Sequence, residues 1–311
     1  MKNGIINIGT RASKLALWQA EYVAAEIERH HPSYRTKLKK MTTKGDRILD
    51  APLAKIGGKG LFTKELEQAM LAGQIDIAVH SLKDMPTEIP KGLIIGAITK
   101  RLDPGDAFVS VNYTSIEELP IGAKVGTSSL RRRAQLLAVR PDLQLLDLRG
   151  NVNTRLAKLD AGDFDAIILA AAGLKRLGLG NRICSILSQR MMLPAVGQGA
   201  LAIECRADDT RILSVIDFLH DRNMSAAAMA ERAFLCRVEG GCQIPVGVYA
   251  DLKEDGLLHV DAMIASVDGI RVCRSRCTGS AERAEDLGIS LAEELLDAGG
   301  REILKEIGIA V

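Results

Sequence analysis

The chain has 311 residues, of which 47% are hydrophobic and 26% are charged, and its formal net charge is +2 at pH 7. This length is enough for two or three domains with sizeable cores, and the composition is that of an ordinary globular protein. The small net charge and the 3% of aromatic residues argue against a nucleic-acid-binding protein, which would need a basic field or a platform of stacking rings.

The sequence also argues against export, membrane insertion and metal binding. The first residues contain no apolar signal-peptide core, and the longest apolar run, around 166–174, is too short to span a bilayer. The six cysteines and five histidines show no metal-ligand spacing. We therefore expect a cytoplasmic protein with no metal and no membrane contact.

Strands and helices alternate from the N-terminus, beginning with a strand at 5–8 and a helix that Ser13 can cap. The long polar segment 42–60 is typical of a lid, a binding loop or a disordered loop. A strand at 75–79 ends in the polar turn 80–84, which stops at Pro86. The other elements expected in this part are strands at 35–41 and 93–98 and a helix at 61–72.

The same alternation repeats after the turn-rich segment 101–106, which we interpret as a crossing between domains. Strands are expected at 123–126, 143–148 and 165–169, each followed by a helix, and a second crossing is expected near 194–199. This order predicts two similar α/β domains with parallel or mixed sheets, joined by right-handed crossovers within each sheet. Two crossings between the domains would make a hinged, two-lobed clamp.

Beyond about residue 220 the alternation gives way to one helix, three β-like stretches and a closing amphipathic helix. This order predicts a small C-terminal α+β domain. The expected boundaries are 1–99 with 200–219 for domain 1, 100–199 for domain 2 and 220–311 for domain 3.

Basic residues gather at the carboxyl ends of the predicted strands, where α/β proteins usually bind ligands. A cation there opposes the dipole of the next helix at a cost of about 0.3–1 kcal/mol. Because cations occur at five such junctions, a bound polyanion is favoured over a set of unrelated surface residues or interdomain salt bridges. Arginine suits carboxylates and phosphates because its fork pairs with two oxygens. The residues concerned are Arg11, Lys83, Arg131, Arg132, Arg149, Arg155 and Arg176.

Asp84 is the lone acid that we expect among these cations. The hydroxyls of Thr127, Ser128 and Ser129 can cap a helix, line an anion site, or do both. Phe62 is either core filling or an aromatic face for a planar ligand. These residues by themselves leave two classes open: a hinged binding or sensor protein for an acidic metabolite, and an enzyme that acts on a multiply carboxylated substrate.

Five long motifs, however, occur in order along the chain. They are GTRASKLALWQ at 9–19, VHSLKDMP at 79–86, GTSSLRR at 126–132, LRGNVNTR at 148–155 and GGC at 240–242. With them, the chain closely resembles the porphobilinogen deaminases, also called hydroxymethylbilane synthases. The resemblance implies two periplasmic-binding-protein-like domains of type II and a third α+β domain.

The resemblance also implies the activity. A dipyrromethane cofactor would be attached through a thioether to Cys242, although a lone cysteine is more often buried and inert. Four porphobilinogen molecules would be joined head to tail onto this primer with loss of ammonia, and hydrolysis would release hydroxymethylbilane. Asp84 would be the catalytic residue, because a carboxylate can stabilise the positive charge that develops on pyrrole nitrogens.

Further roles are implied residue by residue. The cofactor would be bound by Lys83, Asp84, Thr127, Ser128, Ser129, Arg131, Arg132 and Arg155. The incoming substrate would be bound by Arg11, Ser13, Arg149, Arg155, Arg176 and Gln198. Lys55, Lys59 and Phe62 would belong to a lid that excludes water. The expected partner is the small-molecule substrate, without nucleic acid or membrane, and the expected oligomeric state is a monomer.

Overall fold

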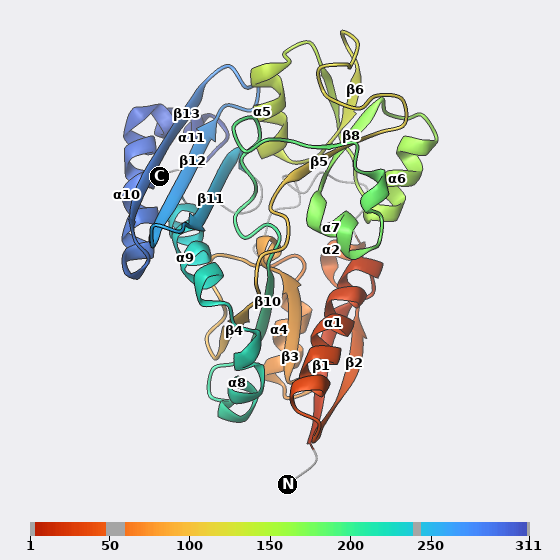
Figure 1. Ribbon diagram of the computed structural model, residues 1–311, viewed down its shortest axis with the longest axis vertical. Helices are drawn as coiled ribbons and strands as arrows, with labels where there is room; N and C mark the ends of the chain where they lie inside the picture. The colour runs from red at the N-terminus through yellow and green to blue at the C-terminus, as the bar shows by residue number, and fades with distance from the viewer. Residues whose placement is uncertain (1–3, 48–59, 239–243, 310–311) are drawn as a thin grey trace.

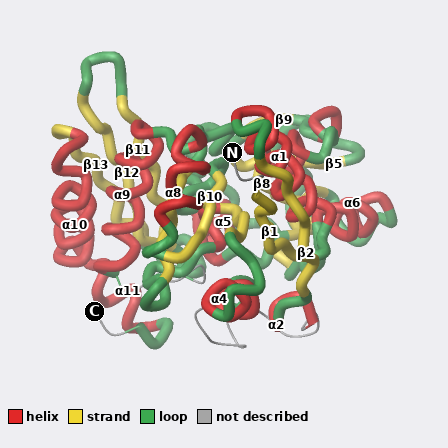
Figure 2. The backbone as a smooth tube through the Cα atoms, turned by 90° about the horizontal axis from the view of Figure 1, so that it is seen from below, coloured by secondary structure: helices red, strands yellow, loops and turns green. Residues whose placement is uncertain are grey.

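The structure is a computed structural model, and it describes residues 4–47, 60–238 and 244–309. Figure 1 shows three units, each built around one sheet. The described residues form two five-stranded sheets and one three-stranded sheet. Figure 2 shows that the C-terminal strands and their helices lie on one side of the molecule, with α6 (Val152–Asp160) on the opposite side. Within the described ranges, none of the helices combines the length and the apolar character needed to cross a membrane.

The first sheet has the strand order β2-β1-β3-β10-β4. Its strand β1 runs parallel to β2 and β3, whereas β10 lies antiparallel between β3 and β4. The strands are β1 Gly4–Arg11, β2 Tyr34–Met41, β3 Ile77–Ser81, β4 Leu93–Ile98 and β10 Leu201–Arg206. The helices of this unit are α1 Lys14–His30, α2 Lys44–Arg47, α4 Lys64–Leu71 and α8 Thr210–Ile216.

The second sheet repeats this plan with the order β7-β6-β8-β5-β9. Its strand β6 runs parallel to β7 and β8, and β5 runs antiparallel to β8. The strands are β5 Asp106–Ser110, β6 Lys124–Gly126, β7 Gln144–Leu146, β8 Ala166–Ala170 and β9 Ser185–Ile186. Besides α6, the helices are α5 Leu130–Val139 and α7 Ala171–Arg176.

The third unit is an antiparallel sheet of β11 (Val246–Leu252), β12 (Leu257–Ala265) and β13 (Val272–Ser280). Three helices accompany it: α9 Arg222–Arg237, α10 Ala284–Leu295 and α11 Arg301–Glu306. Its apolar core reaches into the first unit and includes Leu82 and Met85, which are 1% and 3% exposed. The turn expected to carry Lys83 and Asp84 is therefore anchored in the core of another unit.

The chain crosses from the first sheet to the second between β4 and β5 and returns between β9 and β10. Each of the two sheets thus contains one antiparallel strand that directly follows a crossing. This arrangement confirms the expected fold of two type II periplasmic-binding-protein-like lobes, two hinge crossings and a small α+β unit.

The strands β5 and β10 were not predicted from the sequence. Their residues are buried on both faces except at the last position of each strand, so they lack the alternation of apolar and polar residues that marks a half-buried strand. The helix expected from residue 61 begins instead at Lys64, because residues 60–63 form a turn in which Gly60 accepts from the amides of Thr63 and Lys64.

Candidate active site

A single 3-10 turn, Leu82–Asp84, follows β3 and places Lys83 and Asp84. The amide of Leu82 donates to the carbonyl of Ala200 at 3.0 Å, and the amide of Met85 donates to the carbonyl of Leu82 at 3.1 Å. Because Leu82 and Met85 are both buried in the core, the two polar residues between them stay half-buried at its surface. The turn is thus held in place by its neighbours and by backbone hydrogen bonds.

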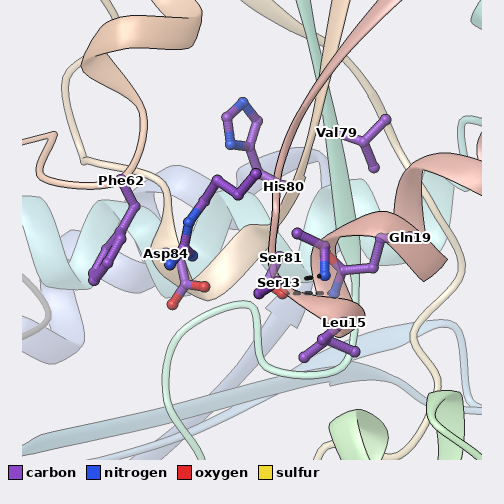
Figure 3. A pocket seen from close by; sticks show the side chains of 10 residues that line it. Ser13, Leu15, Gln19, Phe62, Val79, His80, Ser81 and Asp84 are labelled. Atoms are coloured by element: carbon purple, nitrogen blue, oxygen red, sulfur yellow. Dashed lines mark hydrogen bonds between the residues drawn. The ribbon is translucent and has the colours of Figure 1, made fainter. Parts of the chain in front are cut away.

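Asp84 lines a pocket together with residues from the start of α1, the end of β3 and the segment before α4. In Figure 3, the ring of Phe62 lies on one side of Asp84, and Ser13 and Gln19 lie on the other. The guanidinium carbon of Arg11 stands 4.2 Å from the centroid of the Phe62 ring. Phe62 is thus half-buried and lines the pocket beneath the Arg11 guanidinium.

Two hydrogen bonds fix the position of α1 beside this pocket. The Oγ of Ser13 accepts from the amide of Ala16 at 3.3 Å and caps α1, as the sequence predicted. The amide nitrogen Nε2 of Gln19 donates to Oγ of Ser81 at 2.8 Å. The first helix is therefore tied to the strand that precedes the Lys83–Asp84 turn.

A second group of predicted residues surrounds Asp106, a residue that the sequence pattern did not indicate as part of the site. Arg131 Nη1 donates to Oδ2 of Asp106 at 2.7 Å, and Arg132 Nη2 donates to Oδ1 at 2.6 Å. The Nε2 of Gln198 also donates to Oδ1, at 3.0 Å. Burial alone would raise the pKa of the Asp106 carboxyl, but the positive charges of Arg131 and Arg132 hold its pKa well below the usual range.

The expectation that Asp84 is the lone acid among the cations is therefore wrong. Asp106 begins β5 and pairs with Ala170, the last residue of β8. Because β5 runs antiparallel to β8, its first residue lies at the carboxyl edge of the parallel strands. A polar residue at the start of an antiparallel strand would have been the signal, but the strand itself was not recognised.

Lys83 connects the two groups. Its Nζ donates to Oε1 of Gln198 at 3.4 Å. Burial lowers the pKa of Lys83 to about 8; the nearby Arg132 and Arg131 act in the same direction, and Asp84 and Asp106 act against it. Lys83 is therefore mostly protonated at pH 7, but it loses its proton as the pH rises through about 8.

Arg149 lies in the loop between β7 and α6, and Arg155 lies in the first turns of α6. The Nε of Arg155 donates to the carbonyl of Gly150 at 2.8 Å, and Asn151 caps α6 by accepting from the amide of Thr154. Gly150 has φ of 113°, a left-handed conformation that suits glycine. Burial lowers the pKa of Arg155 to about 10, helped by the charges of Arg132 and Arg149 and opposed by that of Asp84.

Arg176 lies at the crossing between the lobes. Its Nη2 donates to the carbonyl of Gly199 at 2.7 Å, and its guanidinium carbon stands 6.0 Å from the centroid of the Trp18 ring in α1. Burial lowers its pKa to about 10. Arg176 therefore connects α7 of the second lobe with the crossing and with the first helix.

The three hydroxyl residues before α5 already have partners within the chain. Ser129 accepts from the amide of Arg132 and caps the helix, and Thr127 accepts from the amide of Ser129 at 3.2 Å. The Oγ of Ser128 donates to the carbonyl of Leu148 and accepts from its amide. The expected capping role is thus present, and it brings the turns after β6 and β7 together.

Three predicted residues, Lys55, Lys59 and Cys242, lie outside the described residues. In the part of the chain that the structure describes, no three histidine, cysteine or acidic side chains are grouped closely enough to hold a metal ion. What the described residues form is a cationic site between the lobes with a half-buried carboxylate, Asp84, on a fixed turn. Such a site can bind a molecule with several carboxylates and stabilise positive charge near Asp84.

Comparison with known families identifies the chain. A family model described as "Porphobilinogen deaminase, dipyromethane cofactor binding domain" matches residues 6–214, and one described as "Porphobilinogen deaminase, C-terminal domain" matches residues 225–297. The chain therefore belongs to the porphobilinogen deaminase family, which confirms the resemblance found in the sequence. It is an enzyme that condenses porphobilinogen stepwise on a dipyrromethane cofactor in tetrapyrrole biosynthesis. Of the two classes left open, the sensor protein is excluded.

Solved structures of binding proteins resemble parts of the chain more distantly. A nutrient-binding protein from Burkholderia cenocepacia bound to methionine shows 15% identity and a TM-score of 0.43, and the match covers 68% of this chain and 90% of that one. The substrate-binding domain of a putative molybdenum ABC transporter from Clostridium difficile shows 10% identity and a TM-score of 0.46, covering 70% and 93%. Such low values say nothing about what this chain binds.

Proposed function

We propose that Asp84 is the catalytic residue of the condensation and that Cys242 holds the dipyrromethane cofactor through a thioether. The observation that carries the first assignment is the position of Asp84, on a turn anchored by Leu82 and Met85 and in a pocket lined with Arg11. The second assignment rests on the Gly-Gly-Cys motif at 240–242.

The described residues fit a cofactor with several carboxylates. Positive charge comes from Lys83 in the turn after β3, from Arg131 and Arg132 in the first turn of α5, and from Arg155 in α6. Burial makes these charges costly without an anion. We assign the cofactor carboxylates to these four cations, with Thr127, Ser128 and Ser129 at the start of α5 and Asp84 facing the rings. When bound, the dipyrromethane supplies the nucleophilic pyrrole carbon onto which substrate is joined.

We assign the incoming porphobilinogen to a second set of polar residues, which shares Arg155 with the cofactor set. These residues are Arg11, Ser13, Arg149, Arg155, Arg176 and Gln198. Phe62, stacked under the Arg11 guanidinium, offers a flat face to a pyrrole ring. Lys55 and Lys59, which lie beyond the described residues, are proposed to act with Phe62 as the lid.

Asp84 acts in two ways in this proposal. Its carboxylate stabilises the positive charge that develops on pyrrole nitrogens when the aminomethyl group of the substrate loses ammonia. It also accepts hydrogen bonds from the pyrrole N–H groups and orients the reacting rings. The cations around it neutralise the substrate carboxylates, so the positive charge at the reacting centre is left to Asp84.

The wider assignments stay as the sequence suggests them. We propose domain boundaries at 1–99 with 200–219, 100–199 and 220–311, in line with the passage of the chain between the sheets. We further propose that the enzyme works in the cytoplasm as a monomer, with porphobilinogen as its partner and without nucleic acid.

Intact-mass measurement tests the cofactor and its attachment together. Protein produced with porphobilinogen available should carry the added mass of a dipyrromethane, and Cys242→Ser should carry none. Cys236→Ser is the matched control, because Cys236 is an exposed thiol six residues earlier in the chain. Equal added mass on Cys242→Ser, or none on the unaltered protein, would contradict the attachment.

A further inference from the structure

We propose that Asp106 is an internal competitor for the carboxylates of bound ligands and so limits how tightly the site holds a growing polyanion. This proposal rests on the function above, in which Arg131 and Arg132 bind cofactor carboxylates. Asp106 thereby adjusts the affinity of the site through these two arginines, and it is a positioning residue rather than a catalytic one.

The geometry is that of a bound carboxylate. Oδ2 of Asp106 accepts from Arg131 Nη1 at 2.7 Å, and Oδ1 accepts from Arg132 at Nε, 3.1 Å, and at Nη2, 2.6 Å. The Asp106 side chain is 0% exposed, and those of Arg131 and Arg132 are 5% and 7% exposed. A ligand carboxylate that approaches these arginines meets two guanidinium groups whose positive charge Asp106 already balances in part.

Asp106 cannot easily withdraw from this position. It is the first residue of β5, its carbonyl accepts from the amide of Leu187, and its Oδ1 also accepts from Gln198. Gln198 in turn accepts from Lys83. The internal carboxylate is thus tied to β5, to the return crossing and to the turn that carries Asp84.

The charge of Asp106 is also constant. Arg131 and Arg132 hold the pKa of this carboxyl well below its usual range, so it stays ionised near neutral pH. The cations around Asp106 are Arg131, Arg132 and Lys83, and Asp84 is a second carboxylate that acts on Lys83. Buried guanidinium groups need a counter-ion in any case, but a counter-ion placed at the ligand site also weakens every ligand carboxylate that binds there.

The reaction gives a reason for this arrangement. Each porphobilinogen that is added brings an acetate and a propionate, and the finished polyanion must then leave the site. At an effective dielectric constant of about 20, removal of one unit charge within about 10 Å of a bound carboxylate changes its binding by roughly tenfold or more. Without Asp106, ligands should bind more tightly and products should leave more slowly.

The direct test measures binding rather than activity. Benzene-1,3,5-tricarboxylate is titrated into cofactor-free Cys242→Ser protein by calorimetry, with and without Asp106→Asn. We expect Asp106→Asn to bind this probe at least about tenfold more tightly and with a steeper salt dependence. The matched control is Asp103→Asn, which removes one carboxylate from the same crossing but pairs with Lys175. It should change the affinity by less than about twofold.

The loaded enzyme provides a second measurement. After a limiting amount of porphobilinogen, intact mass should show longer adducts retained by Asp106→Asn than by the unaltered enzyme, and added salt should release them. A purely structural counter-ion would not lengthen the retained adducts. If the unaltered enzyme itself carries no cofactor mass, the proposed attachment fails, whereas the probe titration still decides the role of Asp106.

Two outcomes would overturn the proposal. One is an Asp106→Asn protein with a native unfolding transition that binds the tricarboxylate no more tightly than its parent. If Asp106→Asn does not fold, the second test compares the affinity of Arg131→Gln for the probe with that of the double variant Asp106→Asn, Arg131→Gln. The double variant should bind the probe about tenfold more tightly than Arg131→Gln alone, and equal affinities would refute the competition.

Discussion

The protonation of Lys83 offers a sharp test of the electrostatics of the site. Burial lowers its pKa to about 8 in the absence of a ligand. Roughly a tenth of the Lys83 side chains are then neutral at pH 7, half at pH 8 and nine tenths at pH 9. The site therefore loses one of its cations in a pH range where arginines keep theirs.

A bound carboxylate should reverse this shift. An anion within hydrogen-bond distance favours the ammonium form and raises the pKa of a lysine by about 1–3 units. Above pH 8 the free protein must take up a proton when it binds an anion at Lys83. The affinity should therefore fall by up to about tenfold for each pH unit above 8, until the pKa of the complex is reached.

The assay is competitive acylation of lysines with acetic anhydride at a series of pH values, followed by peptide mass spectrometry. Lys83 should titrate near pH 8 in cofactor-free Cys242→Ser and at least about one unit higher in the loaded enzyme. In Lys83→Arg the guanidinium stays protonated, so anion affinity should lose this pH dependence. The reasoning is refuted if Lys83 titrates at the same pH in both forms, or near 10.5 without cofactor.

Three further predictions concern the turn and the cleft. Asp84→Asn should keep its cofactor mass and its fold but lose about 100-fold or more in turnover, because the isostere carries no negative charge; near-normal turnover would contradict its role. Gly197→Ala should cost about 2–4 kcal/mol of unfolding free energy and reduce turnover, because φ is +69° and the new Cβ would lie 2.5 Å from Cγ of Leu82. Gly178→Ala, with φ +70° and nothing within 4 Å, should cost only about 1 kcal/mol, and equal losses in denaturant unfolding would disprove the clash. Arg155→Gln should leave adducts of intermediate length on the protein, visible by intact mass; a changed KM without such adducts would rule out a role in moving the chain.

The sequence alone was sufficient for the family and for much of the fold. The five motifs are long, ordered and rich in unusual combinations, such as a lysine and an aspartate directly after a strand. The alternation of strands and helices also predicted two similar lobes, because half-buried elements leave their period in the sequence. Helix caps such as Ser13 and Ser129 were predictable for the same reason, since capping depends only on residues three positions apart.

The sequence did not reveal the two buried strands or the site residue that one of them carries. The strands β5 and β10 are covered on both faces, so their sequences lack a strand period. The first residue of β5, Asp106, is also the last residue of the turn-rich crossing expected at 101–106. Asp106 was missed together with its strand. A polar residue within an apolar run carries no local information about its partner, so the sequence around Asp106 did not show that it pairs with arginines.

Only the tertiary structure decided which charges meet. Arg131 and Arg132 lie 25 and 26 residues from Asp106 and reach it because β5 runs antiparallel to its neighbour. The position of the Lys83–Asp84 turn likewise depends on Leu82, which packs in a core shared with the C-terminal unit. Local periodicity records whether a residue is buried, whereas strand direction and packing between distant segments determine what it touches.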